Sequence, residues 1–374
     1  MRSARSPASL ARSALLLAAT CGLFQPAPAP AAEGIREIHH VCAVKTGCFV
    51  GDAPGYPVTL LTSGSYRLTS KLVVPNEDTD AIVVTQPNTT IDLAGFEIVR
   101  TACLGATTSC TASAGTGSGI VASDPATLRG IAVRGGTIIG MGSFGVSLGP
   151  QADVRDLRVR WNRLDGIAVG AHSAVTGSNA LENGGTGIST GIASRISGSV
   201  ANGNGEGGIR ADDGSRISDS VARGNVQVGI EAGHAAVVAG NAVAFNGDLG
   251  ISAGLEAVIE GNTSSQNGAA GIRAVSGATI SGNTVSANGG GGIVAVHGCT
   301  VSGNTIRANQ GTGISLGSHG TVQRNTVSFN SLLGLSLGSG SAYRENTIAE
   351  NTLGTVTGGL DRGANVCNGT LSCP

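Results

Sequence analysis

The chain contains few charged and few aromatic residues. Only 13% of its 374 residues are Asp, Glu, Lys or Arg, 3% are aromatic, and the formal net charge is −1. Proteins that bind nucleic acid without sequence specificity need a basic electrostatic field, so this composition argues against that partner. Apart from the N-terminal leader, no segment approaches the roughly 18 consecutive apolar residues of a membrane-spanning helix, so we expect none.

What the chain does contain is a strict repeat. From Val133 to Gly363 the sequence repeats every 21 residues, in eleven rows without insertion or deletion. A period this regular predicts that each row forms the same loop of backbone and stacks on its neighbour. The rows begin at Val133, Val154, Val175, Ile196, Ile217, Val238, Ile259, Ile280, Val301, Val322 and Tyr343.

Aligning the rows as columns 1 to 21 shows which side chains face inward. Column 1 is Val or Ile in every row except the last, and column 14 is always Ile, Val or Leu. Columns 14 and 16 are apolar around a mostly polar column 15, which is the period of two of a strand. We predict three short strands per row, near columns 4 to 6, near columns 14 to 17 and from column 20 to column 2. These strands, stacked in parallel, predict an all-β, single-stranded parallel β-helix with 21-residue coils. We expect it to be right-handed, as most parallel crossover connections are.

Two further columns support this fold. Gly fills column 13 in ten rows, which suits either a positive φ or a close backbone approach just before a strand. Asn fills column 9 in ten rows, from Asn162 to Asn351, and column 4 in the last six rows. Identical Asn side chains at strand spacing are expected to hydrogen-bond along the stack as a ladder.

Other repeat folds fit this pattern less well. Left-handed hexapeptide helices need a period divisible by six, and calcium-binding nonapeptide repeats need a recurring Asp that no column supplies. Leucine-rich repeats need a Leu spacing that these rows lack.

The N-terminus is typical of an exported protein. In residues 1–31, three arginines precede the apolar stretch Ala14–Ala19, and Ala29 and Ala31 have the spacing of a cleavage site. Lipid attachment at Cys21 is the alternative, and Thr20 before that residue counts against it. We therefore predict a secreted, periplasmic or outer-surface location.

The rest of the chain divides into four predicted segments. Residues 32–54 form a cap, which a β-helix requires because its open end offers unpaired strand edges. Residues 55–132 form irregular N-terminal coils, residues 133–363 the eleven regular coils, and residues 364–374 a C-terminal tail.

Six of the cysteines outside the leader form three pairs close in sequence. All six lie outside the regular rows, and we predict local disulfides between Cys42 and Cys48, Cys103 and Cys110, and Cys367 and Cys373. Spacing alone leaves fifteen possible pairings of six cysteines. Cys299 is left over and is expected to be a buried small hydrophobic residue.

Several segments resemble the right-handed parallel β-helix proteins of the pectate-lyase-like superfamily. They are Thr90–Ile98, Gly119–Val121, Arg134–Ile138 and the recurring Gly-Asn-Thr-Val…Asn-Gly…Gly-Ile, and the likeness covers the chain from about residue 55 onward. Cys42–Phe49 and Asn365–Gly369 are similar to motifs of exported bacterial β-helix repeat proteins. The resemblance implies a right-handed helix. It does not imply one activity, because this fold hosts lyases, hydrolases, epimerases and inert adhesins.

The site of the related polygalacturonases is not recognisable. That family shows Asn-x-Asp, Asp-Asp, Gly-His-Gly and Arg-x-Lys in order, whereas here Asp212-Asp213 precedes Asn246-Gly-Asp248. Ser318-His319-Gly320 lacks the first Gly, and neither Arg-x-Lys nor the Asp-Pro-His of alginate epimerases is present.

One outward-facing cluster remains as a candidate catalytic site. Column 15 places Arg210, Glu231, Ser252 and Arg273 on successive coils, and Asp212, Asp213 and His234 lie beside them in columns 17 and 18. The pattern predicts that Arg210 lies next to Glu231 and that Asp213 lies next to His234. The competing interpretation is a pair of exposed cross-strand ion pairs worth roughly a few tenths of a kcal/mol.

A second candidate is a basic patch for ligand binding. It comprises Arg155, Arg158, Arg160, Trp161 and Arg163, where Arg beside the single Trp would hold an anionic sugar by charge and stacking. Asp165 is expected to pair with one of these arginines. The competing interpretation is a solvated face near the N-terminal end.

These observations favour an exported, non-catalytic glycan-binding or cell-envelope surface module. The alternative is a lyase, hydrolase or epimerase acting on a uronate-containing polysaccharide, and an adhesin that associates end to end is a third possibility. Polysaccharide is thus the expected partner. We predict no cofactor and no metal site, and Ca²⁺ enters only under the lyase alternative.

Overall fold

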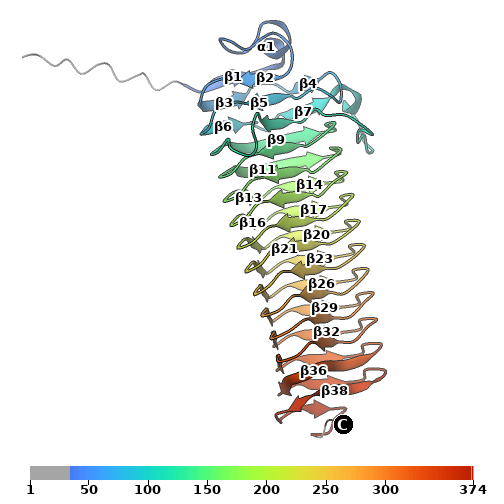
Figure 1. Ribbon diagram of the computed structural model, residues 1–374. Helices are drawn as coiled ribbons and strands as arrows, with labels where there is room; N and C mark the ends of the chain where they lie inside the picture. Colours follow the sequence, from blue (N-terminus) through green and yellow to red (C-terminus); the bar gives the residue numbers. More distant parts are fainter. Residues whose placement is uncertain (1–33, 372, 374) are drawn as a thin grey trace, which may run out of the picture. The chain divides into compact units, whose positions relative to one another are not determined.

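The computed structural model describes residues 34–371 and residue 373, so the predicted signal peptide and Cys21 lie outside the described residues. From Ile35 onward the strands stack in parallel along a single column, with the N-terminal coils at one end (Figure 1). Successive coils pair 21 residues apart, as Ile188 does with Ile209. The predicted all-β parallel β-helix with 21-residue coils is confirmed.

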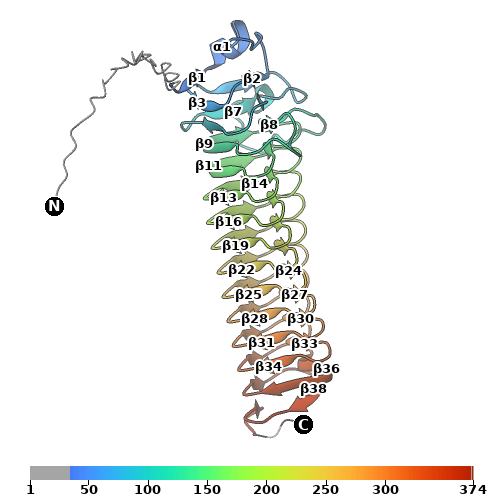
Figure 2. The same ribbon diagram turned by 60° about the vertical axis from the view of Figure 1, so that its left-hand side comes forward.

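Each coil contributes one strand to each of three faces. We call face A the sheet over columns 14–16, face B the sheet over columns 21–2, and face C the sheet over columns 5–7. In Figure 2 the labelled strands of face A and those of face B form two separate series that run along the helix. Face A comprises β2 (Val58–Leu60), β5 (Ile82–Val84), β8 (Ile120–Ala122), β10 (Val146–Leu148), β12 (Ile167–Val169), β15 (Ile188–Thr190), β18 (Ile209–Ala211), β21 (Ile230–Ala232), β24 (Ile251–Ala253), β27 (Ile272–Ala274), β30 (Ile293–Ala295), β33 (Ile314–Leu316), β36 (Leu333–Arg344) and β38 (Gly354–Asp361).

Four longer strands turn a corner between two faces. β9 and β11 run through faces B and C, and β36 and β38 run through faces A and B, so the end of β38 also belongs to face B. Face B comprises β1 (Arg36–Ile38), β3 (Gly64–Leu68), β6 (Thr89–Asp92), β9 (Ala132–Ile139), β11 (Asp153–Arg160), β13 (Ala174–Thr176), β16 (Arg195–Ser197), β19 (Arg216–Ser218), β22 (Val237–Ala239), β25 (Val258–Glu260), β28 (Thr279–Ser281), β31 (Thr300–Ser302), β34 (Thr321–Gln323) and part of β36. Face C comprises β4 (Leu72–Val74), β7 (Glu97–Arg100), parts of β9 and β11, β14 (Asn179–Leu181), β17 (Val200–Asn202), β20 (Val221–Arg223), β23 (Ala242–Ala244), β26 (Thr263–Ser265), β29 (Thr284–Ser286), β32 (Thr305–Arg307), β35 (Thr326–Ser328), β37 (Thr347–Ala349) and β39 (Val366–Cys367).

The core runs without a break through the first ten regular coils, because the residues of columns 1, 6, 14 and 16 are buried in each of them. Ile188 and Ile272 of column 14 are both fully buried. The strand expected near columns 4 to 6 instead covers columns 5 to 7, as in β29, because the column 4 residue Asn283 directly follows the bend at Gly282 and precedes the strand.

In each of the first ten regular coils, three left-handed residues bend the chain, in columns 3, 8 and 19. In the second regular coil they are Asp156, Trp161 and His172, with φ angles of 54°, 59° and 58°. These columns hold many residue types besides Gly, so the composition of the rows did not reveal them.

Both predicted Asn ladders are present. In column 9, the backbone N–H and the side-chain Nδ2 of Asn288 both donate to Oδ1 of Asn309, at 3.1 and 2.9 Å. Nδ2 of Asn288 also donates to the carbonyl of Ser264 at 3.2 Å. Column 4 repeats this arrangement up to Asn346, whose N–H and Nδ2 donate to Oδ1 of Asn365 in the tail. Each Asn side chain thus satisfies backbone groups of the preceding coil, and its own backbone N–H is satisfied by the Asn of the following coil.

The column 13 glycines allow the backbones of neighbouring coils to approach closely. The other expected reason for Gly in this column, a positive φ, is wrong. None of these glycines has a positive φ. A Cβ on Gly292 would lie 2.6 Å from the carbonyl oxygen of Gly313 in the next coil. The exception, Thr355, lies in β38, which pairs with β36 on one side only.

The N-terminal end carries α1 (His40–Lys45), whose Cys42 and Ala43 are buried, and η1 (Thr101–Cys103) begins the long insertion after β7. The three predicted disulfides, Cys42–Cys48, Cys103–Cys110 and Cys367–Cys373, are all present. Cys299 is a free, fully buried thiol, as expected, and donates to the carbonyl of Val275 at 3.0 Å.

Candidate functional site

Face A carries a shallow groove along the first four regular coils. Its volume is about 290 Å³, and it lies over the ends of β10, β12, β15 and β18. We define the face A groove by Ser147, Ala168, Ser189, Arg210 and Asp212, which line it together with their strand neighbours. The first four are column 15 residues of successive coils, which point outward because columns 14 and 16 fill the core.

Arg210 and Glu231 face each other across β18 and β21, as predicted. They are partners in the parallel register, and the Nε to Oε2 distance is 3.8 Å. The two side chains are 58% and 56% exposed, so solvent screens the pair and its contribution to stability is within about 1 kcal/mol. Arg273 lies two coils beyond Glu231, with Ser252 between them, and is exposed.

Asp213 and His234 lie on neighbouring coils, but the expected acid–imidazole pair is not formed. Oδ1 of Asp213 accepts from the backbone N–H of His234 at 2.7 Å. The Nδ1 atom of His234 in turn accepts from the backbone N–H of Leu255 at 2.9 Å. Both side chains therefore hydrogen-bond to the backbone of the following coil.

A carboxyl that the sequence analysis assigned elsewhere lies at the edge of face A. Asp165, expected to pair with an arginine of the basic patch, instead accepts the backbone N–H of Thr186 at 2.9 Å. The Thr186 hydroxyl donates to Oε2 of Glu206 at 3.5 Å. Asp165 therefore lies two coils before Glu206 and Arg210, which share one coil, and Thr186 lies in the coil between them.

The environment of Asp165 raises the pKa of its carboxyl group. Burial raises the pKa of this carboxyl above its ordinary value of 3.8, the Thr186 N–H lowers it, the Glu206 carboxylate raises it, and Arg210 lowers it. A partly buried carboxyl beside a second carboxyl is the kind of group that proton-transfer sites use.

We expect Asp165→Asn to stabilise the protein at neutral pH. The pKa of Asp165 is higher in the folded than in the unfolded chain. Its contribution to the stability of the fold is therefore most favourable below pH 3.8, and it is lost as the pH rises through the raised pKa of the folded state. The difference in melting temperature between variant and parent should therefore be smallest at pH ~3 and favour the variant at pH ~7. Asp248→Asn, at an exposed carboxyl, controls for net charge. A less stable Asp165→Asn protein at neutral pH would contradict this account.

The residues of the basic patch do not converge on one site. Arg155 pairs with Asp153 on face B, with Nε 2.7 Å from Oδ1. Arg158 is exposed, and Arg163 reaches toward the carbonyl of Gly115, with 3.5 Å between the atoms. Each arginine thus points to a different part of the surface.

Trp161 is not available for stacking a sugar. Its side chain is only 5% exposed, and its Nε1 donates to Oε2 of Glu182 at 2.7 Å. The Arg160 guanidinium lies over the indole at 4.3 Å from the ring centroid. The role expected of Trp161 as an open platform is therefore wrong, because the insertion and Arg160 cover the ring.

The family model of the right handed beta helix region matches residues 144–300 and 230–364, which together make up more than half of the chain. The chain belongs to the right-handed β-helix family. The comparison with curated proteins found no match.

Solved structures show the same fold at low sequence identity. The A-module of the mannuronan C-5 epimerase AlgE6 of Azotobacter vinelandii is 17% identical, with a TM-score of 0.53 over 83% of this chain and 91% of that one. The periplasmic alginate epimerase AlgG is 14% identical, with a TM-score of 0.48 over 75% of this chain and 74% of that one. At 17% identity, the likeness to the AlgE6 module shows the fold of this β-helix protein alone.

Among residues 34–371 and 373 of this β-helix protein, no three or more His, Cys, Asp or Glu side chains are grouped so as to hold a metal ion. No helix in the same part is long and apolar enough to cross a bilayer.

Proposed function

We propose that this β-helix protein is a non-catalytic binding module that holds a neutral polysaccharide lengthwise in the face A groove. The observation that carries the proposal is the groove itself. It runs across successive coils, it is open to solvent, and small or hydroxyl side chains such as Ser147, Ala168 and Ser189 line it. Such a surface accepts an extended chain and offers hydrogen bonds to its hydroxyl groups.

The charges near the groove favour a neutral ligand. Columns 11 to 18 of the four coils between Leu164 and His234 contain one Arg and five carboxylates. The carboxylates are Asp165, Glu206, Asp212, Asp213 and Glu231. A chain of uronates would meet like charges there, which weakens its binding, whereas an uncharged glycan pays no such penalty.

We also propose that the protein works outside the cytoplasm. Its three disulfides are typical of proteins in oxidising compartments. The predicted signal peptide supports the same location, in the periplasm or at the outer cell surface.

Ser189→Trp is expected to weaken binding of a neutral polysaccharide at least about tenfold, because the indole would fill the groove. Affinity electrophoresis in gels containing neutral glucans, polygalacturonate or alginate measures this effect. Ser315→Trp is the matched control, because Ser315 occupies column 15 of β33, outside the groove. Equal losses in both variants, or retardation by the acidic polymers alone, would contradict the proposal.

A second candidate is an enzyme that cleaves or epimerises a uronate polysaccharide. It is favoured by the raised pKa of Asp165, the nearby Glu206 carboxylate and the Arg210 charge. Glycoside hydrolysis uses one protonated and one ionised carboxyl group in this way. New reducing ends or unsaturated products from the same polymers, lost in Glu206→Gln, would replace the binding proposal with this one.

A further inference from the structure

The long insertion of residues 101–117 covers the N-terminal coils of face C and does not line the face A groove. Beneath it, Val99, Ile139 and Arg160 occupy the same outward position on successive coils. Val99 and Ile139 are 1% and 3% exposed, and they form a separate apolar cluster with Cys103 and Trp161. Arg307, in the corresponding column of a coil without such a cover, is exposed.

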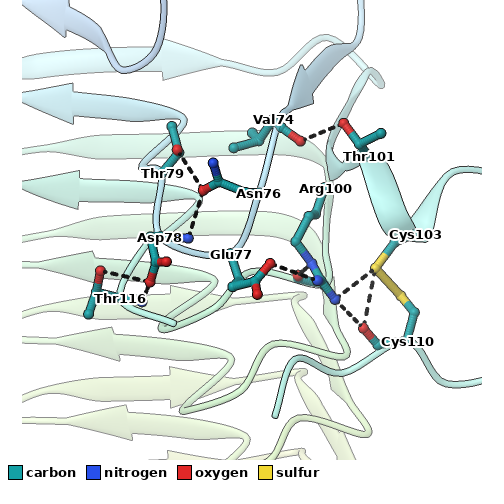
Figure 3. Close-up of polar contacts among 11 residues, drawn as sticks. Val74, Asn76, Glu77, Asp78, Thr79, Arg100, Thr101, Cys103, Cys110 and Thr116 are labelled. Atoms are coloured by element: carbon teal, nitrogen blue, oxygen red, sulfur yellow. Dashed lines mark hydrogen bonds and ion pairs between the residues drawn. A yellow bond between two sulfur atoms is a disulfide. The ribbon is translucent and has the colours of Figure 1, made fainter. Parts of the chain in front are cut away.

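Arg100 anchors this insertion at the end of β7 (Figure 3). Its Nη2 donates to the carbonyl of Cys110 at 2.7 Å, and its Nη1 lies 3.5 Å from Oε2 of Glu77. Its Nε donates to the carbonyl of Gly140 at 2.6 Å. Together with the Cys103–Cys110 disulfide, these contacts hold the insertion above face C as a fixed roof.

A cavity of about 210 Å³ lies between this roof and face C. Its apolar lining comprises Val99, Ile139, Leu104 and Ala106, and its polar lining comprises Lys71, Glu97 and Arg160. Liquid water would fill this volume with about seven molecules, so the space suits a small organic molecule.

Arg160 stacks on Trp161, but its charge has no carboxylate partner among the described residues of this cavity. Its Nε is buried and has no hydrogen-bond partner among the described residues, and none of their carboxylates forms an ion pair with it. Lys71 and Glu97, by contrast, pair with each other at 4.0 Å. The cavity lining therefore carries one net positive charge. A buried donor without a partner is costly, and a carboxylate would satisfy it through a charge-assisted hydrogen bond.

We propose that this cavity binds a small organic carboxylate, with its charged end on Arg160 and its apolar body against Val99 and Ile139. The site is separate from the face A groove and does not depend on the polysaccharide proposal. The insertion after β7 is then the roof of a ligand pocket.

The chain contains a single Trp, so the fluorescence of Trp161 reports on this cavity directly. Titration with butyrate is expected to change the emission saturably, whereas butyramide, its uncharged isostere, leaves it unchanged at the same concentrations. Arg160→Gln should weaken the response to butyrate at least about tenfold, the value of one charge-assisted hydrogen bond.

Arg223→Gln is the matched control, because Arg223 also stacks on an aromatic ring, Phe245, at 4.6 Å, but outside the cavity. It should bind butyrate like the parent protein. Circular dichroism of both variants verifies that they fold. If Arg160→Gln does not fold, Lys71→Gln provides a second test, because it removes the other cation of the cavity lining and should also weaken the response to butyrate. The proposal is overturned if butyrate produces no saturable change, if butyramide acts equally, or if folded Arg160→Gln titrates like the parent.

Discussion

Asn288→Ala is expected to lower the free energy of unfolding by roughly 2–6 kcal/mol, because each buried group left without a partner costs about 1–3 kcal/mol. Asn288 is fully buried. Its Oδ1 accepts the backbone N–H of Asn267 at 3.1 Å, and its Nδ2 donates to the carbonyl of Ser264 at 3.2 Å. Alanine leaves at least these two backbone groups without a hydrogen bond, inside a wall from which water is excluded.

The control for this variant is Gln266→Ala. Gln266 is an exposed amide next to Asn267, and other coils already carry Ala at its position, as at Ala287 and Ala308. We expect a change within about 0.5 kcal/mol, as for most surface substitutions. Chemical denaturation followed by circular dichroism compares the two. Equal effects of both substitutions would show that the ladder contributes nothing beyond the packing of the coils.

Gly208→Ala is expected to destabilise the protein by about 3 kcal/mol, at the upper end of the usual cost of overpacking. A Cβ on Gly208 would lie 2.5 Å from the carbonyl oxygen of Gly229 and 2.6 Å from Nδ2 of Asn225. Neither atom can retreat easily, because the first is backbone of the next coil and the second is bound within the column 9 ladder. The added methyl group therefore forces two coils apart.

Gly198→Asp is the matched control in the same coil. Gly198 has a φ of +59°, and a Cβ added there would meet no atom within 4 Å. Asp156 and Asp219 adopt the same backbone conformation in the same column, both with φ 54°. We expect this change to cost less than about 1 kcal/mol. A thermal melt in which both variants lose the same stability would refute the close-approach role of column 13.

Much of the architecture followed from recurring residues. Column 14, with Ile188 and Ile272, predicted the buried side of a strand, and the Asn columns predicted the ladders that the structure contains. A repeat makes such predictions strong, because each position is sampled once per coil and every coil must satisfy the same contacts. The disulfides followed from proximity in sequence, as Cys103 and Cys110 illustrate.

The candidate sites were less predictable, because they depend on which side chains meet between coils. Arg210 and Glu231 were found because they share a column, whereas Asp165 and Glu206 lie in different columns and were not connected. Arg160 and Trp161 were correctly placed together, but their burial depends on the irregular insertion beyond Arg100. An insertion that occurs once has no repeat from which its path can be derived.

The sequence by itself determined the stacking of this protein, since a 21-residue period with fixed apolar, Gly and Asn positions admits one way of burying its core. Only the tertiary structure decided that Asp213 and His234 bind backbone groups, and that a roofed cavity surrounds Arg160. The physical reason is that burial in columns 1 and 14 repeats in every coil. The direction and partners of an outward side chain, by contrast, depend on neighbours that occur only once.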